Sequence, residues 1–132
     1  MTAGLAPSLV SGWFNTLRAA GSAYSAVAAT YAQLHTGDPG AAGTSNVSAG
    51  TSTRNSFTFA ASSSGSALAL SAAPSAWTNG GTSETLTHIS VWTASSAGTF
   101  LFSVALTASK AWASADTFTL QSLGVSLSAQ AA

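Results

Sequence analysis

The sequence has no cysteine and almost no charge. Three of its 132 residues are Lys or Arg and three are Asp or Glu, so the net charge is zero and charged residues make up 5% of the chain. The missing cysteines exclude disulfides and thiolate metal sites. With no basic patch and no run of 18 apolar residues, we expect neither nucleic acid nor a membrane as a partner.

Small side chains dominate the composition instead. Ala, Ser and Thr account for 70 of 132 residues, whereas Leu, Ile, Val and Phe account for 25. Such a low apolar share indicates disorder only when the net charge is high, so we expect a folded chain. A net charge of zero does little to keep a free monomer soluble, which favours a protein that is packed into an assembly.

An amphipathic helix is predicted near the N-terminus. Pro7 suits its first turn, Arg18 lies in its last turn and Gly21 follows its end. We assign residues 1–27 to an N-terminal helical arm and residues 28–132 to the main domain. Apolar residues recur through the helix at three-to-five-residue spacing. They are Leu5, Leu9, Val10, Trp13, Phe14 and Leu17.

This helix has two alternative roles. Its apolar face packs on its own domain, or it docks on a neighbouring subunit. The candidate docking residues are Leu9, Trp13, Phe14 and Leu17.

Short strands are predicted through the rest of the chain. They cover residues 28–35, 85–93 and 100–106, with shorter runs around 57–59 and 68–70. Near the C-terminus the alternation changes parity, which predicts either a bulge near Gln121 and Ser122 or two strands that meet in a corner. Many short strands with Ser/Gly turns and a single helix predict a mainly β protein: a β-sandwich or jelly-roll-like domain after a short N-terminal amphipathic helix.

The stretch "LHTGDPG", residues 34–40, places two ionisable residues, His35 and Asp38, three positions apart in a chain that has few of them. Asp38, Pro39 and Gly40 suit the successive positions of a tight turn. His35, Asp38 and His88 are the only candidates for a metal site, and their spacing favours a turn over a ligand set. The chain has no G-x-S-x-G elbow and no close pair of carboxylates. We therefore expect no catalytic residues, no cofactor and no bound metal.

Arg54 follows a long uncharged loop and needs a partner if it is buried. Asp38 begins the same loop, so we predict that an ion pair between Asp38 and Arg54 closes it.

Four tryptophans suggest either a core or interface role, or a carbohydrate-binding face. Core or interface is the favoured interpretation, and a glycan partner the weaker one. The tryptophans are Trp13, Trp77, Trp92 and Trp112.

Several segments together resemble a family of small tailed-phage virion proteins, often labelled minor tail or tail-fibre proteins, especially from phages of actinobacteria. The resemblance covers roughly residues 28–128 and rests on "LHTGDPG", on the arginine step "TRNSFTF", on "LTHISVW" and on "GTFL". Asn46 is followed by Val47 where the family tends to have an acidic residue, and Ser52 stands where it tends to have tyrosine. Residues 1–27 do not match this pattern firmly.

The resemblance implies a non-enzymatic virion subunit on the capsid or the tail exterior. Composition and the amphipathic helix favour a capsid decoration subunit bound to the major capsid protein, as a homo-oligomer and most simply a trimer. The alternatives are an accessory protein on the tail, bound to tail proteins, and a glycan-binding module that recognises a receptor.

Overall fold

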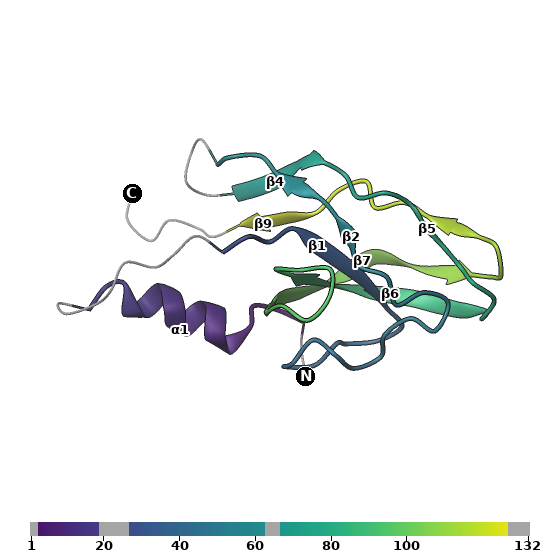
Figure 1. Ribbon diagram of the computed structural model, residues 1–132, viewed down its shortest axis with the longest axis horizontal. Helices are drawn as coiled ribbons and strands as arrows, with labels where there is room; N and C mark the ends of the chain where they lie inside the picture. The colour runs from purple at the N-terminus through teal and green to yellow at the C-terminus, as the bar shows by residue number, and fades with distance from the viewer. Residues whose placement is uncertain (1–2, 19–26, 63–66, 127–132) are drawn as a thin grey trace.

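The structure is a computed structural model that describes residues 3–18, 27–62 and 67–126. It is mainly antiparallel β with one short N-terminal helix, which confirms the predicted fold class. No helix in the described ranges is both long enough and apolar enough to cross a membrane. Figure 1 shows two layers of strands, with the helix α1 at one end of the molecule.

The first layer is a four-stranded sheet in the order β2-β1-β6-β7. Leu34 lies opposite Ile89 and Ala32 opposite Val91, and all four side chains are fully buried on the face toward the second layer. The strands are β1 (Tyr31–His35), β2 (Asn55–Ser56), β6 (Glu84–Trp92) and β7 (Phe100–Trp112).

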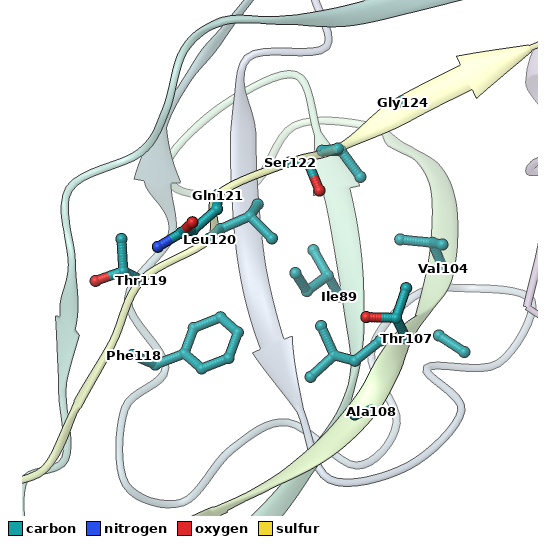
Figure 2. A pocket seen from close by; sticks show the side chains of 13 residues that line it. Ile89, Val104, Thr107, Ala108, Phe118, Thr119, Leu120, Gln121, Ser122 and Gly124 are labelled. Atoms are coloured by element: carbon teal, nitrogen blue, oxygen red, sulfur yellow. The ribbon is translucent and has the colours of Figure 1, made fainter.

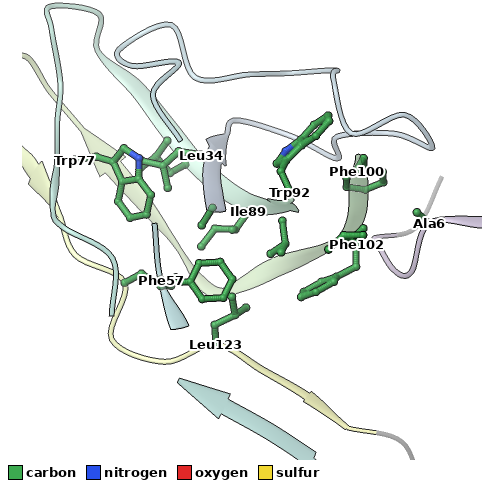
Figure 3. Close-up of a cluster of buried hydrophobic side chains, with 14 of the residues drawn as sticks. Ala6, Leu34, Phe57, Trp77, Ile89, Trp92, Phe100, Phe102 and Leu123 are labelled. Carbon is green, nitrogen blue, oxygen red and sulfur yellow. The ribbon is translucent and has the colours of Figure 1, made fainter. Parts of the chain in front are cut away.

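The second layer is made of two small sheets, β3-β4-β9 and β5-β8. Figure 3 shows Ile89 of the first sheet in one buried cluster with Phe57, which connects β2 to β3, and with Leu123, which precedes β9. The strands are β3 (Thr58–Phe59), β4 (Ala67–Ala72), β5 (Trp77–Thr78), β8 (Thr117–Phe118) and β9 (Gly124–Ser126).

The change of parity near the C-terminus comes from a corner between two strands. β8 pairs with β5, whereas β9 pairs with β4, and residues 119–123 connect them without belonging to either sheet. The alternative of a bulge within one strand is therefore wrong. The single strand predicted around 57–59 is likewise divided, with β2 in the first layer and β3 in the second.

The helix α1 spans Pro7–Asn15, shorter than predicted. Its backbone continues in tight turns, in which the Leu17 amide donates to the Phe14 carbonyl at 3.1 Å and the Arg18 amide to the Asn15 carbonyl at 3.5 Å. Gly21, predicted to follow the helix, lies outside the described residues. Just before α1, the Ala6 amide donates to the Leu101 carbonyl at 2.7 Å, so the chain enters the helix from the edge of β7.

Candidate functional site

The long loop after β1 covers the outer face of the first sheet. The Gln33 side chain donates to the Ser52 carbonyl of the loop at 2.9 Å, while the Ser48 amide donates to the Leu34 carbonyl at 3.0 Å and continues the edge of the sheet beyond β2. β1 is therefore buried on both faces, by the second layer on one side and by its own following loop on the other.

His35 joins this loop to the sheet. Its Nδ1 lies 2.8 Å from the Ser45 carbonyl and its Nε2 lies 2.7 Å from Ser90 Oγ. A carbonyl only accepts, so Nδ1 carries the proton and Nε2 accepts the Ser90 hydroxyl hydrogen. Ser90 Oγ in turn accepts the Trp92 indole N–H at 2.7 Å. The imidazole and the hydroxyl are fully buried and both are occupied by structural bonds, which is unlike a nucleophile and its base.

Burial of the ring lowers the pKa of His35 below its ordinary value of 6.5, mainly because desolvation penalises the charged form; the nearby His88 lowers it further, against the Ser45 bond. The unfolded chain then binds a proton at a higher pH than the folded chain does. The free energy of unfolding should therefore be constant above pH 6.5 and should fall as the pH drops below 6.5.

We expect this loss of stability in urea unfolding curves measured between pH 7.5 and pH 5.5, a range above most carboxylate titrations. The matched variant is His35→Gln, which removes the titrating ring and should flatten the curve over the same range. An equal acid-induced loss in wild type and His35→Gln would contradict this assignment.

The residues considered for a metal do not gather into a ligand set. His35 lies opposite His88 across the β1–β6 pair, but both ring nitrogens of His35 already have partners. Within the ranges that the structure describes, no three His, Cys, Asp or Glu side chains are close enough to share a metal ion.

The Asp38-Pro39-Gly40 segment turns the chain. The Gly40 amide donates to Asp38 Oδ1 at 2.8 Å, and Gly40 has a φ of 74°, in the left-handed region that favours glycine. Asn46 extends this turn, because its side-chain amide donates to the Asp38 carbonyl at 2.9 Å. Among the described residues, Asp38 Oδ2 is buried without a hydrogen-bond partner.

Arg54 does not pair with Asp38, and the predicted ion pair is wrong. The central carbon of its guanidinium lies over the Trp92 ring, 3.6 Å from the centroid, and its Nε donates to Gln33 Oε1 at 3.3 Å. It also donates to the Ala94 carbonyl at 3.2 Å and to the Ala97 carbonyl at 2.6 Å, both in the turn after β6. Carbonyls and an aromatic face satisfy the cation without a carboxylate, which the spacing of charges in the sequence could not show.

Because Asp38 and Arg54 share no partner, their effects on stability should add. We expect Arg54→Ala to lower the free energy of unfolding by about 1–2 kcal/mol, through lost stacking and hydrogen bonds, and Asp38→Ala by about 0.5–1 kcal/mol. The double variant should equal the sum within about 0.5 kcal/mol, measured by chemical denaturation. If the loss in the double variant differed from the sum by more than this, Asp38 and Arg54 would interact, and the absence of an ion pair between them would be contradicted.

Three of the four tryptophans are core residues. Trp77, Trp92 and Trp112 are 2%, 5% and 1% exposed. Each indole N–H has an acceptor: the Thr53 carbonyl for Trp77, Ser90 Oγ for Trp92 and the Asp116 carbonyl for Trp112. These three buried rings therefore present almost no surface to a sugar.

Glu84, at the start of β6, binds the loop through its carboxylate. The sequence did not identify it as a site residue. Its carboxylate accepts hydrogen bonds from the Ser48 hydroxyl, from the Ala49 amide at 3.0 Å and from the Gly50 amide at 3.1 Å. It is the only glutamate in the chain, which was a usable signal. With His35 it attaches the loop to the sheet at two separate points.

A cavity of about 380 Å³ opens between the layers beside β7. There β7 advances five residues, from Ala105 to Lys110, while β6 advances two, from His88 to Leu86, so β7 bulges outward. Figure 2 shows Phe118 and Leu120 facing Ile89 across this space. No charged side chain lines it, so it offers no carboxylate, histidine or lysine to act as an acid or base.

The candidate docking residues, three in α1 and Leu17 in the turns that follow it, separate into two groups. Leu9 is 7% exposed and belongs to the core, and Trp13 packs partly against it. Phe14 is 66% exposed and Leu17 is 80% exposed, and they are the exposed large hydrophobic side chains of the described chain. One side of the helix packs on its own domain while the other faces solvent. This exposed side is the candidate interaction surface of the molecule.

A family model described as "Podophage GP4 fiber I protein gp80" matches residues 12–128. The match begins inside α1 and continues through both layers of strands. The match therefore includes residues 12–27, which the resemblance to small tailed-phage proteins did not cover firmly. No curated protein sequence matches the chain significantly.

Proposed function

Because the chain belongs to the family of the podophage fibre I protein gp80, we propose that it is a non-enzymatic structural subunit of a bacteriophage tail. The observation that carries this proposal is the family match, which covers the β domain and part of α1. The family description supports the tail alternative better than capsid decoration, because it names a fibre protein. The preference for decoration rested on composition, which suits any subunit packed in an assembly.

The partners in this proposal are tail proteins and further copies of the same chain, with three copies favoured. The neutral composition and the exposed apolar side of α1 support an assembled state. An origin in phages of actinobacteria is part of the proposal and rests on the "LHTGDPG" and "GTFL" motifs.

A structural role is also supported by the way the polar side chains are used. His35, Ser90 and Glu84 hold the loop on the sheet, and Arg54 is committed to Trp92 and to backbone carbonyls. These groups stabilise a rigid domain and leave no nucleophile–base–acid set among them.

Cryo-electron microscopy of the phage particle that encodes this chain tests the proposal. We expect density for the two-layered domain on the tail, and loss of that density in particles made without the chain. Density for the domain on the capsid lattice, with none on the tail, would contradict it.

A further inference from the structure

The bond between Asp38 and Pro39 is the only Asp-Pro peptide bond in the chain, because the other prolines follow alanine. The proline nitrogen carries no hydrogen, and it leaves as a basic secondary amine once it takes up a proton. The Pro39 side chain is fully buried, so the fold holds this bond in one place. The loop also arranges two side-chain groups around it.

The Asp38 carboxyl is folded back over this bond. Its Oδ1 accepts the Gly40 amide at 2.8 Å, which closes a ring that contains the Asp38 carbonyl carbon and the Pro39 nitrogen. Its Oδ2 is buried and has no hydrogen-bond partner among the described residues. A buried oxygen in this state has lost its hydration and keeps its lone pairs free, which suits a nucleophile directed at the adjacent carbonyl.

Asn46 polarises the carbonyl that this nucleophile would attack. Its side-chain amide donates to the Asp38 carbonyl oxygen at 2.9 Å, the distance at which a donor stabilises a developing negative charge. Asn46 has a φ of 53°, a left-handed conformation of the kind that is concentrated at active sites. Gly37 leaves room for this side chain, because a Cβ at position 37 would lie 2.9 Å from Asn46 Nδ2.

The surroundings of the Asp38 carboxyl are uncharged. The two groups bound to Asp38, the Gly40 amide and the Asn46 carboxamide, carry no charge. A cavity of about 160 Å³ opens beside Gly40, is lined by uncharged residues and has room for water. A reaction at this bond therefore depends on the protonation of the Asp38 carboxyl itself.

The other titratable side chains whose contacts the structure describes are bound elsewhere. They are His35 with Ser45 and Ser90, Arg54 with Trp92, Glu84 with residues 48–50, His88 with Thr87, and Asp116 with Ala113.

We propose that the folded loop cleaves its own bond between Asp38 and Pro39 when the Asp38 carboxyl is protonated. Asp38 Oδ2 forms a bond to the Asp38 carbonyl carbon while the bond from that carbon to the Pro39 nitrogen breaks. The nitrogen keeps the bonding pair and takes the carboxyl proton. This step gives a cyclic anhydride on Asp38 and a secondary amine on Pro39. One water molecule then opens the anhydride, so the net reaction is hydrolysis of one peptide bond.

This activity goes beyond the proposed structural function, because it is a single reaction of the chain on itself. The cut falls shortly after β1, which pairs with β2 and β6 of the other fragment. The two fragments therefore remain joined within one sheet, and the break is visible only under denaturing conditions.

Mass spectrometry of the purified full-length protein after incubation at about pH 4 tests the proposal, because protein carboxyl groups generally take up protons there. If circular dichroism shows that the chain unfolds at this pH, the rates are compared at the lowest pH at which the fold is intact. We expect fragments 1–38 and 39–132, whose masses sum to that of the chain plus one water. The second fragment should begin with proline on N-terminal sequencing.

The same chain unfolded in urea at the same pH gives the rate of this bond without the loop. The folded chain should be cleaved at least about tenfold faster, because only the fold positions the carboxyl and the Asn46 amide.

Two variants and an internal control assign the roles. Asp38→Asn keeps an oxygen for the Gly40 amide but has no carboxyl group, and should not be cleaved. Asn46→Gly accommodates the positive φ but lacks the carboxamide, and should slow cleavage of the folded chain at least about tenfold. The bond after Asp116 should stay intact, because threonine follows it and Asp116 Oδ2 already accepts the Ala113 amide.

A folded chain that is cleaved no faster than the unfolded chain would overturn the proposal, because the bond would then have only the acid lability of any Asp-Pro bond. Cleavage of folded Asn46→Gly at the wild-type rate would also overturn it. Neither result bears on the proposed place of the subunit in the tail, which imaging of the particle tests separately.

Discussion

Gly43→Ala is expected to lower the free energy of unfolding by about 3 kcal/mol, through backbone strain and overpacking together. Gly43 has a φ of 72°, which a Cβ atom disfavours. A Cβ at this position would also lie 2.4 Å from Cδ2 of the Phe100 ring. That ring is 8% exposed and packs against Trp92 with centroids 5.4 Å apart, so it has little room to move aside.

Substitutions at two other glycines distinguish the effect of backbone strain from that of overpacking. Gly40 has a similar φ of 74°, but its nearest outside neighbour is Ser45 Oγ at 3.3 Å, so Gly40→Ala should show mainly the strain, about 1 kcal/mol. Gly4→Ala has nothing within 4 Å and should change stability by less than about 0.5 kcal/mol. Chemical denaturation of the three variants checks the order. Equal losses for Gly43→Ala and Gly40→Ala would show that the loop does not rest on Phe100.

Trp77→Ala should lower the free energy of unfolding by about 3–5 kcal/mol, because it removes a buried indole and leaves a cavity. Trp77 is 2% exposed, packs near Phe118 with centroids 6.1 Å apart and donates to the Thr53 carbonyl. A loss of this size is a large part of the total stability of a typical domain, about 5–15 kcal/mol. Thermal and urea unfolding both measure it.

The matched control is Trp13→Ala, which truncates the same side chain where it is half-buried on α1 and should cost about 1–2 kcal/mol. Trp77→Phe keeps an aromatic ring in the site and should recover much of the loss. If Trp77→Ala were as stable as wild type, the indole would not be a core residue, and a binding role for it would have to be reconsidered.

Local patterns in the sequence predicted the strands that are long or clearly alternating. The predicted starts of β6 and β7, residues 85 and 100, lie within one residue of the observed starts, because the alternation of side chains along both strands is visible in the sequence. The two-residue strand β5 was not predicted, since so short a segment has no period of its own and is defined by its partner.

The polar network was harder to predict for a related reason. His35, Ser90 and Trp92 come together because β1 and β6 pair in one register, with Gln33 opposite Ser90, although the two strands are more than 50 residues apart in sequence. The Asp38–Arg54 pair was predicted from charge alone. The actual partners of Arg54 are an aromatic ring and carbonyls, which every sequence has in abundance, so composition cannot point to them.

What the sequence by itself determined is the class of protein: a neutral, cysteine-free, mainly β chain with an amphipathic N-terminal helix and a turn at Asp38-Pro39-Gly40. The charge and the lack of cysteine are matters of composition, whereas the helix, the strands and the turn follow from local periodicity and from residue types with restricted backbone angles. Only the tertiary structure decided which tryptophans are buried and which side of α1 stays exposed, because burial depends on what the rest of the chain places against each face.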